Sequence, residues 1–151
     1  MDFEVTVADV PARRTMVIAA ATTWPEFPTL WGQLLGEVWG CLRAGGIERG
    51  CRNVILYRDS VPTVEVGVLL DQPCSLTGRV VASTLPAGTA ATTVHRGSFA
   101  DLGAAHDAVV DWSATHGHRL TGTRWEVYGP HNDDPAQQCT EISWLLSQAK
   151  S

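Results

Sequence analysis

The first half of the chain contains four stretches in which β-branched and other apolar residues are interspersed with polar ones. These stretches are Glu4–Ala8, Thr15–Thr22, Asn53–Arg58 and Thr63–Leu70, and the turn Asp9–Val10–Pro11 separates the first two. Such composition and alternation are typical of strands that bury one face. In the last stretch Val64, Val66 and Val68 share one face, and together with the preceding stretch they predict a β-hairpin.

An amphipathic helix is predicted between these strands. Apolar residues recur at spacings of three and four at Trp31, Leu34, Leu35, Val38, Cys41 and Leu42. Pro25 and Pro28 suit only its first turn, because a proline further inside lacks the amide that the helical hydrogen bonds need. Gly45 and Gly46 mark its end, since glycine adopts the conformations that close a helix.

The second half repeats the order of strand, helix, strand and strand. Its predicted strands are Arg79–Leu85, Thr89–His95, Thr123–Tyr128 and Thr140–Leu146, with a polar loop at 129–139 between the last two. Its helix is expected to begin at the capping box Ser98–Asp101, whose hydroxyl and carboxylate can bind two free amides. The helix then carries an apolar stripe of Leu102, Ala105, Val109 and Trp112 and is expected to stop near Gly117.

The two halves align by a shift of 71 residues, which places Tyr57 on Tyr128 and indicates an internal duplication. We therefore predict a single α+β domain over residues 1–151, with one repeat at about 3–71 and a second at about 77–147. A single strand–helix–strand–strand unit leaves one sheet face uncovered. Two units related by a pseudo-twofold axis are therefore expected to form antiparallel sheets around a central ligand cleft.

Composition favours one globular domain and excludes several classes of protein. With 44% hydrophobic and 18% charged residues, the chain is unlike disordered proteins. Its net charge of −5 gives no field that attracts phosphate backbones or anionic lipid, so neither nucleic acid nor membrane is an expected partner. No apolar run approaches the ~20 residues that cross a bilayer. The acidic start, MDFEVTVADV, is unlike a signal peptide, so we expect a soluble, cytoplasmic protein.

The cysteines and histidines predict no metal or cofactor site. No CxxC pair and no flanking histidine accompany the four cysteines, Cys41, Cys51, Cys74 and Cys139. His116 and His118 lie near a helix end without two further ligands, and His95 and His106 are interpreted as ordinary structural histidines. No strand is followed by a glycine-rich phosphate loop or by a G-x-S-x-G elbow, so no cofactor and no serine nucleophile are expected.

Strand alternation predicts which side chains of the second half face the cleft. In Thr123–Tyr128, the apolar Trp125 and Val127 are expected to pack under the second helix. This arrangement turns Glu126 and Tyr128 to the opposite face, where the cleft is expected.

In the first half, the two residues at the equivalent strand positions are an apolar residue and a tyrosine. The 71-residue shift places Ile55 and Tyr57 at the equivalent strand positions, so the cleft is expected to hold two tyrosines and one carboxylate. The candidate ligand-binding residues are therefore Glu126, Tyr57, Tyr128, Ile55 and, as a wall or lid at or near the start of the first helix, Trp31 and Trp24.

Five short motifs carry a resemblance to a known family. They are Tyr57–Arg58–Asp59, Leu85–Pro86–Ala87–Gly88, His95–Arg96–Gly97–Ser98–Phe99, Trp125–Glu126–Val127–Tyr128 and Thr140–Glu141–Ile142. In this order and spacing they resemble the GyrI-like (gyrase-inhibitor-like) family, whose domain is also the effector-binding module of AraC- and MerR-type transcription regulators. The resemblance implies a central pocket for bulky, often cationic and aromatic compounds, with a carboxylate on the E-x-Y strand, here Glu126. With no room for a helix-turn-helix, the chain resembles the free-standing members.

Three functions are compatible with these residues. The first is a free-standing small-molecule-binding protein that sequesters or senses a drug or toxin, in which Glu126 supplies charge and the aromatic rings supply contact area. The second, which the resemblance implies for some members, is a hydrolase of cyclopropane-containing electrophiles, with Glu126 as general base and Tyr128 as donor to the oxyanion. The third is interaction with a protein such as gyrase. Binding a cation and activating water need the same carboxylate, so the sequence alone does not separate the first two functions.

Overall fold

A computed structural model of the chain describes residues 3–48, 51–70, 72, 74–129 and 133–147. Its elements in chain order are β1 (Thr6–Val10), β2 (Arg13–Ala21), α1 (Phe27–Ala44), β3 (Asn53–Tyr57), β4 (Thr63–Leu69), β5 (Val81–Leu85), β6 (Gly88–Arg96), the 3-10 turn η1 (Phe99–Asp101), α2 (Leu102–Thr115), β7 (Leu120–Tyr128), the 3-10 turn η2 (Pro135–Gln137) and β8 (Cys139–Leu146). The predicted helices and strands are confirmed, with their ends shifted by a few residues. Parts of the expected linker at 71–76 and of the expected loop at 129–139 lie outside the described residues.

The start of the second helix differs in detail from a reciprocal capping box. The Ser98 hydroxyl accepts a hydrogen bond from the Ala100 amide at 3.2 Å, as expected of a capping serine. Asp101 makes no capping bond with its side chain, and the chain enters α2 through the 3-10 turn η1. This tighter turn carries Phe99 toward the space between the helices, which becomes important for the site.

The eight strands form one antiparallel sheet in the order β1-β6-β8-β7-β3-β4-β2-β5. The two halves of the chain meet at the centre, where β3 pairs with β7 and Ile55 lies opposite Glu126. The α+β class is thus confirmed, although the halves share one continuous sheet. The strands of the two halves correspond as β1 to β5, β2 to β6, β3 to β7 and β4 to β8. When each strand is exchanged for its counterpart, the same strand order is obtained, read from the opposite edge of the sheet. The duplication itself stays a prediction.

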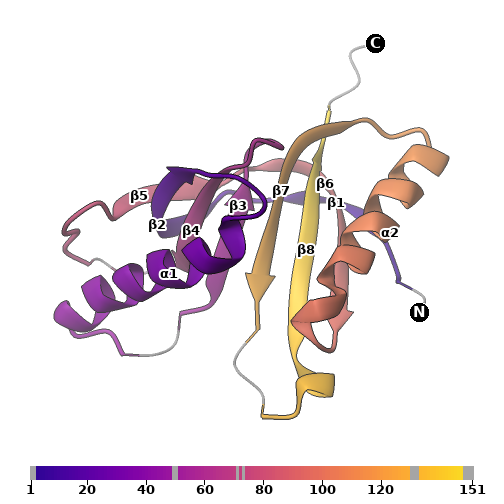
Figure 1. The fold of residues 1–151 in the computed structure, drawn as a ribbon. Coiled ribbons are helices and arrows are strands. Elements are labelled where there is room, and N and C mark those ends of the chain that lie inside the picture. The colour runs from indigo at the N-terminus through magenta and orange to yellow at the C-terminus, as the bar shows by residue number, and fades with distance from the viewer. Residues whose placement is uncertain (1–2, 49–50, 71, 73, 130–132, 148–151) are drawn as a thin grey trace.

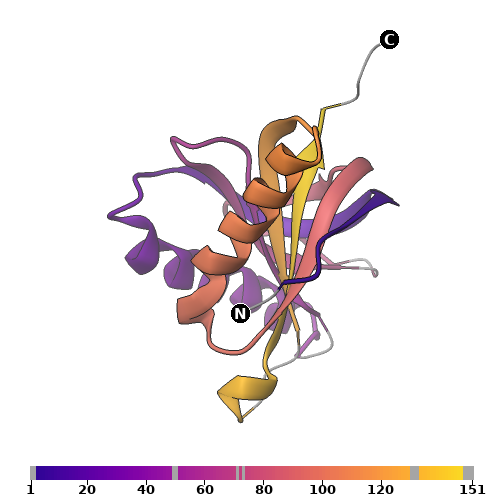
Figure 2. The ribbon, with the colours of Figure 1, turned by 90° about the vertical axis from the view of Figure 1, so that its right-hand side faces the viewer.

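Both helices lie on the same side of this sheet. Figure 1 shows α1 in front of the first-half strands and α2 in front of the second-half strands, with β3 and β7 between them, and Figure 2 shows α2 crossing over its strands. Helix α1 buries Leu34 and Val38 completely, and α2 buries Val109 against Ile142 of β8. Ile142 and Ile55 flank Glu126 in the strand register, so all three face the helices.

The face turned away from the helices is also a core, and this corrects one prediction. Trp125 and Val127 were expected under the second helix, but they pack on the opposite face with Leu56 and with Leu85, from the end of β5. The prediction was wrong because alternation identifies two faces without telling which one a helix covers. Here the back of the sheet is covered as well, because the chain bends between β1 and β2 and between β5 and β6. Glu126 consequently faces the helices.

Candidate functional site

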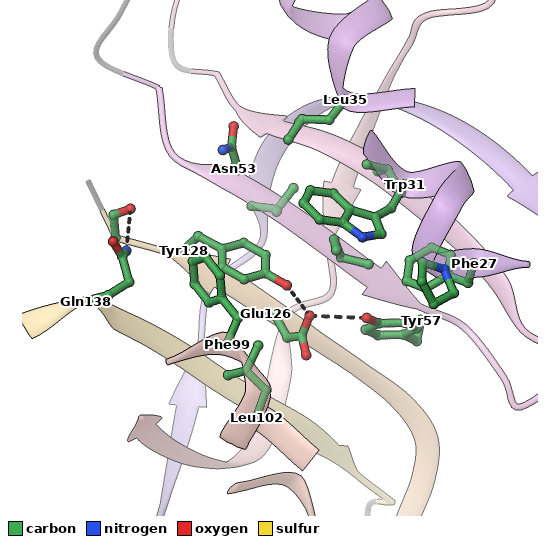
Figure 3. Close-up of a pocket in the computed structure, with 15 residues that line it drawn as sticks. Phe27, Trp31, Leu35, Asn53, Tyr57, Phe99, Leu102, Glu126, Tyr128 and Gln138 are labelled. Carbon is green, nitrogen blue, oxygen red and sulfur yellow. Dashed lines mark hydrogen bonds between the residues drawn. The ribbon is translucent and has the colours of Figure 1, made fainter. Parts of the chain in front are cut away.

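A cavity opens between the two helices, above the central strands β3 and β7. Its volume is about 420 Å³, which lies in the range of small-molecule pockets. The walls are mainly apolar. Figure 3 labels Phe27, Trp31 and Leu35 of α1, Tyr57 of β3, Phe99 of η1 and Leu102 of α2, and Ile55 of β3 and Val66 of β4 also line the cavity. Trp31 and Phe99 are 40% and 53% exposed, which places these two rings at the opening.

Glu126 is the carboxylate that lines this cavity, and it is only 4% exposed. Its Oε1 accepts hydrogen bonds from the hydroxyl groups of Tyr128 at 2.6 Å and Tyr57 at 3.2 Å (Figure 3). Its Oε2 lies 2.6 Å from Nε2 of His106. Three polar groups thus lie within hydrogen-bond distance of the Glu126 carboxylate.

The two tyrosines are held as neutral donors. Burial raises the pKa of Tyr57 and of Tyr128 well above the ordinary value, and the nearby negative charge of Glu126 raises both further. Each phenol can therefore keep donating its proton to the carboxylate at any ordinary pH. The result is a fixed arrangement in which two rings from adjacent strands hold one oxygen of the acid.

Arg124 occupies an aromatic cage next to the cavity. Its guanidinium lies over the rings of Trp24, Tyr57 and Trp144, at 5.6, 5.1 and 5.1 Å from their centroids. It also donates to the backbone carbonyl groups of Asp59 and Gly122. Burial lowers the pKa of this guanidinium, while its carbonyl contacts tie it to the backbone behind Tyr57. The protein's own cation therefore fills this cage.

Five of the six predicted ligand-binding residues line the cavity. These are Glu126, Tyr57, Tyr128, Ile55 and Trp31. The sixth, Trp24, lies behind the wall: its ring packs on Tyr57 at 5.8 Å, and its indole nitrogen donates to the carbonyl of Ser60. Contact of these side chains with a ligand stays a prediction.

Several neighbours of the acid were missed by sequence reasoning. His106 was interpreted as a structural histidine, yet it contacts Glu126 directly. The available signal was its position one helical turn after Leu102, which puts it on the face that α2 turns to the sheet. Phe27 and Phe99 had no signal, because both lie at helix starts, outside the periodic stripe.

The described residues contain no group of three or more His, Cys, Asp and Glu side chains placed to hold a metal ion. In the same part of the chain, neither helix combines the length and the apolar character that a membrane crossing requires.

The family of the chain follows from a comparison with known domains. Residues 3–146 match the model of the GyrI-like small molecule binding domain, and the chain belongs to this family. The resemblance inferred from the five motifs is confirmed. A search of curated protein sequences found no match.

Solved structures with the same fold include a domain of the protein EcmrR and a ligand complex. The C-terminal domain of EcmrR has a TM-score of 0.74 at 20% identity, over 99% of this chain and 100% of that domain. In the EcmrR–DNA complex, where the TM-score is 0.75 at 19% identity, the match covers 97% of this chain but only 58% of the EcmrR chain. SAV2435 bound to tetraphenylphosphonium has a TM-score of 0.65 at 10% identity, over 97% and 94% of the two chains. A hydrolase from Listeria innocua has a TM-score of 0.59 at 12% identity, over 95% and 92%. At these identities the likeness shows the fold alone.

Proposed function

We propose that this protein captures bulky aromatic monocations in the cavity between α1 and α2, with Glu126 supplying the opposite charge. The observation that carries the proposal is a carboxylate 4% exposed among aromatic rings. Among the residues that the structure describes, no lysine or arginine lies within salt-bridge distance of it. A buried charge without an ionic partner is costly, and a bound cation relieves that cost.

The expected gain from charge exceeds that from any single ring. A monocation about 4 Å from the carboxylate gains about 4 kcal/mol at an effective dielectric constant near 20. Each aromatic ring that faces the cation adds roughly 0.5–2 kcal/mol. Because Trp31 and Phe99 stand at the opening and Tyr57 and Tyr128 at the floor, the cavity favours ligands whose charge is surrounded by flat apolar groups.

The geometry favours binding over hydrolysis. A general base needs a lone pair directed at water, and three of the about four lone-pair positions of the Glu126 carboxylate already face hydrogen-bonding groups. The hydroxyl of Tyr128 donates to Glu126, so in this arrangement it is not aimed at a developing oxyanion. An interaction with gyrase finds no supporting observation in the described residues and is not part of the proposal.

Isothermal titration calorimetry with two ions of the same shape tests the proposed function. Tetraphenylphosphonium, the compound bound to SAV2435, and tetraphenylborate differ in charge while both present four phenyl rings. We expect saturable binding of the cation, at one per chain, and at least about tenfold weaker binding of the anion. Equal affinities, or no binding of the cation, would refute the proposal.

Mass spectrometry of the protein incubated with a cyclopropane-containing electrophile tests for hydrolysis. We expect the compound to be recovered unchanged after incubation with the protein. If a cyclopropane-containing electrophile instead gained one water over many turnovers, above the protein-free rate, the assignment would pass to a hydrolase.

A further inference from the structure

Three side chains from three elements form a hydrogen-bonded series that ends on the buried acid. The indole nitrogen of Trp144, on β8, lies 2.9 Å from Nδ1 of His106, on α2. The other ring nitrogen of His106, Nε2, lies 2.6 Å from Oε2 of Glu126, on β7. His106 is thus held between a tryptophan and the acid, with 16% of its side chain exposed.

The position of the proton on His106 follows from the chemistry of its partners. An indole N–H can donate and cannot accept, so Nδ1 of His106 must be the acceptor and carries no proton. A neutral imidazole has one ring proton, which must then be on Nε2, directed at Oε2 of Glu126. If His106 were an imidazolium, its Nδ1–H would point at the N–H of Trp144, and two donors would face each other.

Building on the proposed function, we propose that Trp144 and His106 are positioning residues that keep the site at a full negative charge. Trp144 holds His106 as a neutral Nε2–H donor, which orients Glu126 without cancelling its charge. Selectivity for cations therefore depends on a tryptophan that does not line the cavity. A protonated His106 would pair with Glu126 and leave the cavity nearly neutral.

The groups around His106 include charges of both signs. The titratable or charged side chains near it on the packed strands are Glu126, Tyr128 and Arg124 of β7 and Tyr57 of β3. Glu126 is the acid that contacts His106, and the guanidinium of Arg124 lies 5.1 Å from the centroid of the Trp144 ring. One turn away on α2, the neighbours Leu102 and Val109 carry no charge.

Nuclear magnetic resonance of the ligand-free protein tests the proton position directly. In protein labelled with ¹⁵N-histidine, chemical shifts distinguish a protonated from an unprotonated ring nitrogen, and the signals of His106 are those lost in His106→Gln. We expect Nε2 protonated and Nδ1 unprotonated from pH 8 down to pH 5.5. A proton on Nδ1 in this range would overturn the proposal. This readout needs no ligand and stays decisive even if tetraphenylphosphonium does not bind, which would refute the proposed function alone.

The pH profile of tetraphenylphosphonium affinity tests the consequence for binding. The cation does not titrate, so a change in affinity reports on the protein. We expect the wild type to change by less than about twofold between pH 8 and 5.5. In Trp144→Phe, which frees Nδ1, we expect the affinity to fall by about tenfold or more between pH 8 and 5.5, because a second proton on His106 no longer faces a donor and an imidazolium would pair with Glu126.

Two further variants separate this effect from a general disturbance. The double variant Trp144→Phe/His106→Gln has no imidazole at position 106. The pH dependence of its affinity should therefore disappear, whatever the affinity at pH 8. Trp112→Phe is the matched control, because Trp112 also packs on a histidine, His116, at 4.1 Å between ring centroids, but away from the cavity. Its profile should match the wild type. A flat profile in Trp144→Phe, or a steep one in the wild type, would overturn the proposal.

Discussion

Replacing Glu126 by glutamine removes one charge from the cavity while keeping the shape of the side chain. For a cation whose centre lies about 5 Å from the carboxylate, the lost attraction at an effective dielectric constant near 20 is about 3 kcal/mol. That corresponds to about 150-fold weaker binding of tetraphenylphosphonium. Binding of tetraphenylborate should strengthen, because the same charge repels it. Opposite changes for two ions of one shape are a signature that loss of packing does not produce.

The substitution also disturbs the hydrogen bonds around residue 126. The amide oxygen of a glutamine can accept from the tyrosine hydroxyls or from His106, but its NH₂ group cannot accept at all. At least one donor is therefore left without its partner, and we expect the free energy of unfolding to fall by about 1–3 kcal/mol. Affinities must be measured where the variant is fully folded, as judged by its denaturation curve.

Glu65→Gln is the matched control. Glu65 is 5% exposed, accepts hydrogen bonds from Arg58 and from Ser83 at 2.6 Å, and does not line the cavity. This substitution should reduce stability but leave the affinities for both ions within about twofold, because Glu65 lies on the sheet face of Leu56, opposite the cavity, and its charge is paired with Arg58. Calorimetric titration of the wild type and both variants decides the matter. If Glu126→Gln leaves the affinity for the cation unchanged, or lowers the affinities for both ions equally, the electrostatic reasoning is wrong.

Three further outcomes are expected. Trp31→Ala, at the opening and 40% exposed, should weaken tetraphenylphosphonium binding by about 1 kcal/mol with little change in melting temperature; unchanged affinity by calorimetry would remove Trp31 from the site. Because burial and Glu126 raise the pKa of both Tyr57 and Tyr128, the folded protein retains protons that the unfolded chain releases above about pH 10. The contribution of these two tyrosines to stability should therefore be constant below about pH 10 and fall above it, and ultraviolet titration should show tyrosinate only on unfolding; ionisation at pH 10 in the folded state would contradict this. Leu34→Ala, at a fully buried position, should cost about 2–5 kcal/mol in urea denaturation, and a cost below about 1 kcal/mol would show that α1 packs loosely.

Local patterns predicted the elements well because each element depends on near neighbours in the chain. The i+3 and i+4 spacing from Trp31 to Leu42 and the glycines after it define α1, and alternating valines define β4. The position of Glu126 in the cavity was also anticipated, although from an incorrect assignment of faces. Alternation places Glu126 and Trp125 on opposite sides, and both sides of this sheet are buried. Only the path of the chain behind the sheet determines which side receives the helices.

Contacts that depend on the sheet order could not be predicted in the same way. His106 and Trp144 are 38 residues apart, and neither has a pattern that pairs them. Their meeting requires that β8 lie beside β7 and that α2 cover both. A histidine on a helix is usually structural, so the interpretation of His106 from sequence followed the more frequent case.

At equivalent positions the two halves carry different side chains, and this difference gives the cavity one polar and one mainly apolar side. Under the 71-residue shift, Glu126 corresponds to Ile55, its direct neighbour across the β3–β7 pair, and His106 corresponds to Leu35, which also lines the cavity. The second half therefore supplies the acid, His106 and Tyr128, whereas the first half supplies one donor, Tyr57, among otherwise mainly apolar side chains. A symmetrical cavity with two such acids would place like charges on adjacent strands and raise the pKa of one of them. With a single acid, the cavity can orient a ligand, its charge toward β7 and its apolar groups toward α1.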